Sequence, residues 1–327
     1  GLAYLTGLAD ATWTAIGLAL GTYLNWLIVA KKKRVYSHGY QAITLPDYFS
    51  KRFGDDKHVI TLISAALIVI FFIPYTASGF AACGKLFNSL LGFNYHSAMI
   101  VSAVVIVLYC TMGGFLAAST SDLVQSIIMT FALAVVVIFG IVQAGGMGAV
   151  LDNAKSLPGY LDMFHTHIAE TNSSGDYGFF KIVSTLAWGL GYFGMPHILV
   201  RFMSIEKPSM IKKSSIVAIV WVIISLFSAV LIAYFGRMVM GAELLTQGNQ
   251  KLVFIAMARK FFPAGICGLL LAAIIAASIS TADSQLLVAS SSFTADLYKP
   301  FFRKNASEKE TLMVGNVAMF CQFFFLT

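Results

Sequence analysis

A face of small and hydroxyl-bearing side chains lies within the apolar stretch AASISTADSQLLVASSS, which covers residues 276–292. Five of these residues recur at helical spacing: Ala277, Ser280, Thr281, Ser284 and Ser291. This spacing places them on one side of a helix. Hydroxyl and carbonyl oxygens are hard ligands that suit a small hard cation such as sodium, and they add no negative charge. Similar faces also pack membrane helices together, and spacing alone does not separate the two roles.

A second stretch, LAWGLGYFGMPHILVRF at residues 186–202, predicts a membrane helix that is broken in its middle. Its glycines weaken a helix, and Pro196 removes a backbone hydrogen bond. Backbone opened at mid-membrane depth is tolerated only where it lines a cavity or is covered by protein. Many secondary transporters build their central substrate site from such discontinuous helices.

We expect one aromatic and apolar face on this broken helix, because Trp188, Tyr192 and Pro196 recur every four residues. Such a wall suits the body of a small ring or an aliphatic amino acid, with backbone amides for its carboxylate. The alternative is a kinked helix in which glycines allow close packing and the aromatics belong to the core. Tyr75, which follows the mid-span Pro74, is a further candidate contact, although a lone tyrosine there more often serves packing.

Two aspartates lie in or near the apolar segments. Asp122, in GGFLAASTSDLVQ, is expected at the cytoplasmic edge of a span, where an acid in the first helical turn is favoured by the dipole. Asp283 lies deeper, at a position that a cytoplasmic vestibule would still reach. An acid fully inside the membrane is by default a functional residue.

The elements that position these residues follow from the composition. The chain has 327 residues, of which 58% are hydrophobic and 11% charged, with a mean hydropathy of +0.80. A soluble domain has about 25% charged residues, so the pattern predicts an all-α polytopic membrane protein. Hydropathy and helix breakers predict eight spans, over residues 10–30, 58–84, 96–117, 123–144, 178–203, 214–236, 264–297 and 310–327. The segment 248–262 is too short to span and predicts an amphipathic external helix.

The basic residues give an orientation. Most of the 22 Lys and Arg residues lie in three loops that the predicted spans place on the same side, over residues 31–57, 201–213 and 299–309. The positive-inside rule makes this side, and the loop 31–57, cytoplasmic. The loop 145–176 is poor in basic residues and rich in acids, so we expect it to be external.

Several classes of function are disfavoured by the sequence. The basic residues cluster at helix ends, which does not favour nucleic-acid binding. A GxxxxGK[ST] phosphate loop is absent, so a transporter of this kind needs an ion gradient rather than ATP. Neither a nucleophile–base pair nor a metal-ligand spacing occurs, and the four cysteines fall in apolar stretches as buried thiols, so an enzyme is not expected.

Taken together, the motifs resemble the sodium:solute symporter family. The matching stretches run in order along essentially the whole chain, as TLPDYFSKRF, GGFLAASTSDLVQ, WGLGYFGMPHILVRFM, STADSQLLVASSSFTADLY and RKNASEKE. The third has the form of the proline-transporting members rather than that of the sugar transporters. The resemblance implies a five-plus-five inverted-repeat fold and sodium-coupled uptake of L-proline across the bacterial cytoplasmic membrane by alternating access.

The resemblance also implies roles for individual residues. It assigns sodium to the carbonyl of Ala277 and the hydroxyls of Ser280 and Thr281. It assigns the proline pocket to four residues: Tyr75, Trp188, Tyr192 and Pro196. It matches Asp122 and Arg201 to positions linked to sodium use and to cytoplasmic gating.

The family pattern departs from this chain at both ends. The chain starts without methionine and stops inside an apolar run, so we expect one transmembrane transporter domain, 1–327, truncated on both sides. The first core helix, which supplies the other sodium ligands, is expected before Gly1, and the last core helix and the C-terminal spans after Thr327. The alternatives are the same fold with another solute, such as pantothenate, a monocarboxylate, a sugar or another amino acid, or a sensor module fused to a signalling kinase.

Overall fold

The structure is a computed structural model, which describes residues 1–246 and 248–326. The final residue of the predicted span 310–327 lies outside the described residues. Contacts divide the chain into two compact units, each made of three stretches. Unit 1 comprises Gly1–Val29, Met129–Gly194 and Ser209–Ala272, and unit 2 comprises Ala30–Ile128, Met195–Pro208 and Ala273–Thr327.

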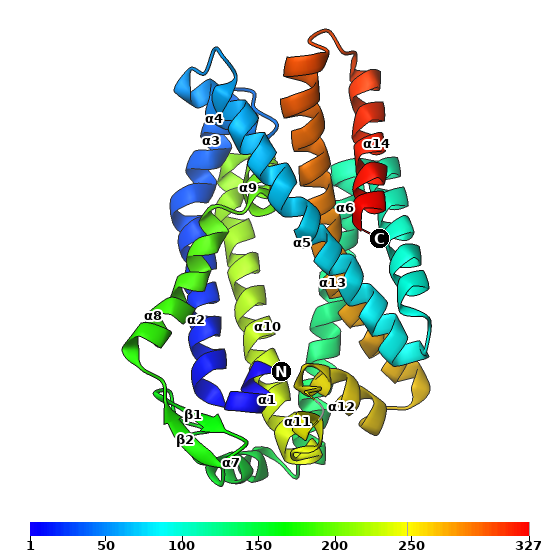
Figure 1. Cartoon of the computed structure of the whole chain (residues 1–327). Coiled ribbons are helices and arrows are strands. Elements are labelled where there is room, and N and C mark those ends of the chain that lie inside the picture. The colour runs from blue at the N-terminus through cyan, green and yellow to red at the C-terminus, as the bar shows by residue number, and fades with distance from the viewer. Residues whose placement is uncertain (247, 327) are drawn as a thin grey trace. The chain divides into compact units, whose positions relative to one another are not determined.

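The described chain is mostly helical (Figure 1). The elements that begin in unit 1 are α1 (Leu2–Thr6), α2 (Leu8–Leu24), the π-helical turn η1 (Asn25–Ala30), α7 (Met147–Lys155), β1 (His165–Ile168), β2 (Ser173–Asp176), α8 (Phe179–Leu186), the 3₁₀ turn η2 (Ala187–Phe193), α10 (Ile211–Met240), α11 (Glu243–Thr246), the 3₁₀ turn η4 (Gln250–Leu252), α12 (Val253–Phe261) and α13 (Ala264–Ser291). Those that begin in unit 2 are α3 (Lys31–Gly39), α4 (Leu45–Phe53), α5 (Val59–Leu91), α6 (Tyr95–Gln143), α9 (Pro196–Met203), the 3₁₀ turn η3 (Pro208–Met210), the π-helical η5 (Ser292–Phe302) and α14 (Glu308–Leu326). Helices α6 and α13 each contribute residues to both units.

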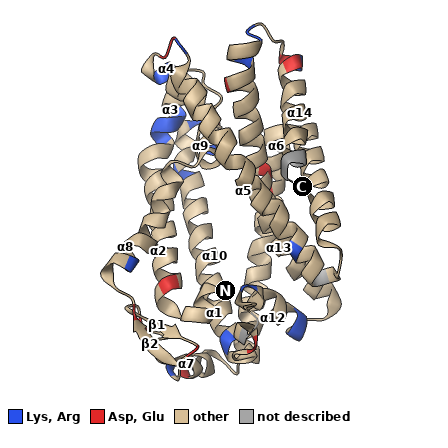
Figure 2. Ribbon diagram, in the orientation of Figure 1, with Lys and Arg blue, Asp and Glu red and all other residues tan. Residues whose placement is uncertain are grey.

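Within the described residues, five helical runs are long and apolar enough to cross a membrane. They are Leu8–Gly39, Val59–Ser89, Tyr95–Gln143, Pro208–Met240 and Ala264–Phe302. Figure 2 shows Lys and Arg gathered at α3 and α4, whereas α10 is uncharged over most of its length. These runs make the protein a multi-pass membrane protein.

The predicted spans 96–117 and 123–144 fall in the single run of α6, but that run is not one regular helix. Gly114 has φ 53° and ψ −141°, so two helices meet there. Only glycine adopts this conformation without strain. The predicted span 178–203 is divided into α8, η2 and α9, which confirms the break expected from its glycines and Pro196.

The contact between α2 and η2 in unit 1 is a direct approach of two backbones. A Cβ atom on Gly189 would lie 1.9 Å from the carbonyl oxygen of Gly17, and one on Gly21 would lie 2.2 Å from the carbonyl oxygen of Gly189. Small residues four apart on one helix allow such an approach in membranes. Part of the glycine content of the broken helix therefore serves packing, as the alternative interpretation expected.

The loop 145–176 contains a feature that an all-helical prediction missed. Strands β1 and β2 form a two-stranded antiparallel sheet in which His165 pairs with Asp176 and Ile168 with Ser173. The two strands have four residues each and lie in a polar loop, so they are too short to show the alternation of hydrophobic residues that predicts a strand.

Unit 2 is built around α5, α6, α13 and α14. Its core contains Phe80 from α5, Ile106 from α6, Leu286 from α13 and Met319 from α14. The predicted loop 31–57 is largely helical, because it folds into α3 and α4.

Two long-range contacts hold these two helices. The Thr44 hydroxyl at the N-terminus of α4 donates to Asp296 of η5 at 2.6 Å, and both residues are buried. The Arg34 side chain of α3 donates to the carbonyls of Ile205 and Glu206.

Candidate functional site

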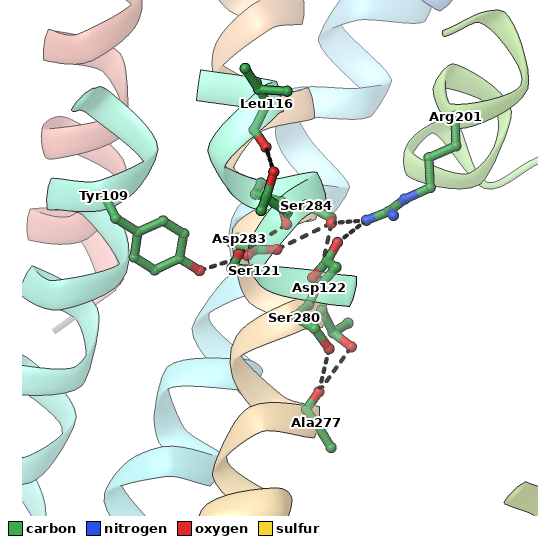
Figure 3. Close-up of polar contacts among 12 residues, drawn as sticks. Tyr109, Leu116, Ser121, Asp122, Arg201, Ala277, Ser280, Asp283 and Ser284 are labelled. Atoms are coloured by element: carbon green, nitrogen blue, oxygen red, sulfur yellow. Dashed lines mark hydrogen bonds and ion pairs between the residues drawn. The ribbon is translucent and has the colours of Figure 1, made fainter. Parts of the chain in front are cut away.

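The hydroxyl face predicted from sequence lies on α13, within the part of the helix that belongs to unit 2. The hydroxyls of Ser280 and Thr281 both point to the carbonyl oxygen of Ala277, at 3.2 Å and 3.3 Å (Figure 3). Ala277 and Thr281 are exposed and Ser280 is half-buried. Three oxygens are therefore close together on an accessible face, and their lone pairs are the type of ligand that sodium prefers.

An ion pair lies beside this face. The guanidinium of Arg201, from α9, pairs with the carboxylate of Asp122, from α6, and donates to the hydroxyl of Ser284, from α13, at 2.6 Å (Figure 3). The Asp122 side chain is only 13% exposed, against 41% for Arg201. Within the described residues, Oδ1 of Asp122 is buried without a hydrogen-bond partner.

The expectation that Asp122 lies in the first turn of a helix is wrong. Asp122 comes eight residues after the break at Gly114, which is beyond the first turn of the second half of α6. Its charge is balanced by Arg201 rather than by the helix dipole. The structure thus pairs Asp122 with Arg201. The sequence resemblance had assigned a role to each residue without predicting that they contact each other.

Asp283 is the second correction, because it is fully buried and not open to a vestibule. Its exposed fraction is 0%, and its neighbours Ala282 and Leu286 belong to the core of unit 2. Its Oδ2 accepts a hydrogen bond from the Tyr109 hydroxyl at 2.6 Å (Figure 3). The acid was visible in the sequence, but its partner Tyr109 was missed, since nothing in the local pattern links the two.

Ser284 joins the hydroxyl face to the ion pair. Its hydroxyl accepts from Arg201, and its own proton is directed toward the carbonyl oxygen of Ser280 and Oδ1 of Asp283, each at 3.1 Å. The result is one continuous polar network inside a single unit. It runs from Ala277 through Ser280 and Ser284 to Arg201 and its partner carboxylate.

Two of the residues assigned to the solute pocket belong to unit 2. Tyr75 is 40% exposed and its ring meets the edge of Phe72 at 6.0 Å between centroids. Phe72 also contacts the ring of His197 at 5.7 Å, directly after Pro196, which is buried at the start of α9. Phe72 therefore links Tyr75 to the beginning of α9.

The other two residues, Trp188 and Tyr192, lie on η2 in unit 1. Trp188 is 68% exposed, and the carbonyl of Tyr192 accepts a hydrogen bond from the side-chain amide of Asn25 at 2.9 Å. The predicted common face of Trp188, Tyr192 and Pro196 is wrong, because η2 is a 3₁₀ helix with three residues per turn. Met195 is moreover extended, with φ −74° and ψ 109°, so the four-residue spacing does not stack the side chains.

A multi-pass helical protein with a broken helix and a charged network within its apolar segments has the architecture of a secondary transporter. The family profile of the sodium:solute symporters matches residues 1–323. The chain belongs to the sodium:solute symporter family.

Several curated relatives are similar over nearly the whole chain. It is 40% identical over 322 residues to the sodium/proline symporter of Escherichia coli (strain K12). This match covers 97% of this chain and 62% of that protein. It is also 40% identical over 323 residues to the sodium/proline symporter of Staphylococcus aureus and to sodium/proline symporter 2 of Staphylococcus saprophyticus, covering 98% of this chain and 61% of each. The chain thus spans about three fifths of the length of these relatives.

A solved structure shares the fold. It is the substrate-bound outward-open state of a Na⁺-coupled sialic acid symporter, described as revealing a novel Na⁺ site. The TM-score is 0.74, and the match covers 98% of this chain and 70% of that one. At 15% sequence identity this likeness establishes the fold alone.

Proposed function

We propose that the full-length protein takes up L-proline together with sodium across the bacterial cytoplasmic membrane by alternating access. The observation that carries this proposal is the polar network of unit 2, in which the oxygens of Ala277, Ser280 and Thr281 are joined through Ser284 to the Arg201 ion pair. The identity to proteins named sodium/proline symporters supports the choice of ion and solute.

The proposed fold is the five-plus-five inverted repeat, with about eight of its helices inside residues 1–327 as part of one transporter domain. The loop 31–57 is cytoplasmic and the loop 145–176 is external in this arrangement. Sodium binds at the carbonyl of Ala277 and the hydroxyls of Ser280 and Thr281. Because the chain spans about three fifths of the length of its curated relatives, sodium binding is proposed for the full-length protein.

The proposed solute pocket is lined by Tyr75, Trp188, Tyr192 and Pro196. Apolar rings suit the pyrrolidine ring of proline, and free backbone amides of the broken helix suit its carboxylate. Sodium and proline both favour the occluded state, so each raises the affinity for the other. The membrane potential adds about 2.3 kcal/mol per charge per 100 mV to the driving force for uptake.

Asp122 and Arg201 serve coupling in this scheme. The Nη2 of Arg201 contacts both the Asp122 carboxylate and the hydroxyl of Ser284. Occupation of the hydroxyl face reorients Ser280, whose carbonyl lies 3.1 Å from the Ser284 hydroxyl. The state of the ion site is thereby transmitted to the charged pair on α6 and α9.

The proposal is tested by uptake of radiolabelled proline into proteoliposomes that contain the full-length protein. We expect uptake with an inward sodium gradient and only background uptake with an equal potassium gradient. Excess unlabelled pantothenate or a monocarboxylate is expected to leave proline uptake unchanged. Uptake that is equal in sodium and potassium would refute the coupling, and competition by another solute would change the substrate.

The sodium site is tested by Thr281→Ala in the same assay. Loss of one oxygen that contacts a cation costs about 1.5–3 kcal/mol, so the half-saturating sodium concentration is expected to rise about tenfold or more. Thr281→Ser keeps the hydroxyl and should restore most of the affinity. The matched control is Ser278→Ala, which removes another hydroxyl of α13; among the described residues this hydroxyl bonds the Ile274 carbonyl of its own turn, at 3.4 Å. If Thr281→Ala and this control have the same sodium dependence, the assignment of the site is wrong.

A further inference from the structure

A buried amide side chain lies where α2 passes into the π-helical turn η1. Asn25 is only 1% exposed, and its Nδ2 donates to the carbonyl oxygen of Tyr192 at 2.9 Å. Both residues belong to unit 1. A polar group buried in an apolar segment is costly unless it is hydrogen-bonded, so this contact fixes the position of both partners.

The chemistry of residue 196 explains why this particular carbonyl takes a side-chain donor. In a continuous α-helix the carbonyl of Tyr192 would accept from the backbone N–H of the residue four positions later. That residue is Pro196, which has no N–H. The amide of Asn25 offers the hydrogen-bond donor that the proline removes.

The spacing along α2 places this donor next to the close backbone contact between α2 and η2. Gly17, Gly21 and Asn25 are four residues apart and share one face of the helix. The two glycines let the backbone of α2 touch that of η2 at Gly189, and Asn25 reaches η2 one turn further along. Backbone contact and a hydrogen bond together hold the 3₁₀ turn against α2.

We propose that Asn25 is a positioning residue for the solute pocket. By holding the carbonyl of Tyr192 it fixes the 3₁₀ turn that carries Trp188 and Tyr192, and so it sets the affinity for the solute. The inference rests on the proposed role of this turn in binding proline. Asn25 itself contacts backbone and not solute.

The first test uses Asn25→Leu, which keeps the approximate size but has no donor, in the full-length protein in proteoliposomes. We expect the half-saturating proline concentration to rise about tenfold, with a much smaller change in the half-saturating sodium concentration. Asn25→Asp, which presents only acceptors when ionised, should be at least as impaired. The matched control is Thr22→Val, because within the described part of the chain the Thr22 hydroxyl, one turn away, bonds the Leu18 carbonyl of its own helix at 2.9 Å.

A double-mutant cycle with Pro196→Ala gives a second readout that does not depend on the solute. Alanine restores an N–H at position 196 and frees residue 195 to become helical, so the Tyr192 carbonyl gains a backbone donor. We expect Asn25→Leu to lower the melting temperature of the purified protein clearly in the parent, and much less in the Pro196→Ala background. Equal losses in the two backgrounds would overturn the hydrogen-bond assignment.

The outcomes separate this inference from the proposed function. If the parent protein shows no sodium-dependent proline uptake, the proposed function fails, whatever the Asn25 variants do. If the parent transports proline and Asn25→Leu keeps the same half-saturating proline concentration as Thr22→Val, the positioning role is refuted. A loss of melting temperature without a change in proline affinity leads to the same conclusion.

Discussion

Replacing Gly189 by alanine is expected to lower the melting temperature of the full-length protein by about 3 °C or more, or to prevent its folding. The added Cβ would lie 1.9 Å from the carbonyl oxygen and 2.8 Å from the carbonyl carbon of Gly17, and 3.1 Å from the Cα of Gly21. All three are backbone atoms, so no side chain can move aside and the two helices must separate. Overpacking of this kind costs about 3 kcal/mol or more, which corresponds to roughly 4 °C in a chain of this size and to less in a longer one.

The chain offers a matched control two residues away. A Cβ on Gly191 would have no atom within 4 Å, so Gly191→Ala in the same 3₁₀ turn should leave the melting temperature within about 1 °C of the parent. Both variants add one methyl group to the same segment, and only the approach of α2 distinguishes them. Equal melting temperatures for the two variants would show that α2 does not contact η2 as closely as described.

The broken helix has one feature that could be predicted from the sequence and one that could not. A break in the helix around residues 186–202 was predictable, because glycine and proline act locally on the backbone. The form of the break was not, since glycine and proline weaken an α-helix without choosing the 3₁₀ turn that replaces it. The common face of Trp188, Tyr192 and Pro196 was therefore inferred from the wrong period.

The candidate ion site likewise has one part that the sequence predicts and another that it does not. The hydroxyl face of α13 was predictable from a spacing within one helix. The partners that join it to charge come from far along the chain. Tyr109 and Asp283 are separated by 174 positions, and Asp122 and Arg201 by 79. Such pairs depend on how helices pack, and a single sequence contains only their residue types.

A buried hydrogen bond between Thr44 and η5, the π-helical segment that follows α13, was missed for the same reason. Thr44 is the N-cap residue of α4. Its hydroxyl accepts from the Asp47 N–H as a cap and also donates to Asp296, 252 positions away. The first contact is local, whereas the second joins residues far apart in the sequence and depends on how the helices pack.

Replacing Arg201 by methionine is expected to lower stability and to abolish sodium-dependent uptake. The Asp122 carboxylate, with its side chain 13% exposed, would be left in a largely buried position without its cation. Removal of one partner of a fully buried ion pair costs about 3–5 kcal/mol, largely because the remaining charge is uncompensated, and we expect a smaller loss here because the Arg201 side chain is 41% exposed. The measurements are the melting temperature of the full-length protein and the initial rate of proline uptake.

The origin of this loss is tested by adding Asp122→Asn to Arg201→Met. The double variant has no buried charge left over, so its melting temperature should recover most of the loss, while uptake stays low because the charged pair is absent. The matched control is Lys207→Met, which removes an exposed cation 3.6 Å from Glu206, shortly after α9. An exposed pair of this kind contributes about 0–1 kcal/mol, so this control should have little effect on either measurement. If the double variant is no more stable than Arg201→Met, uncompensated charge is not the cause; if the double variant regains full uptake, the pair serves stability and not coupling.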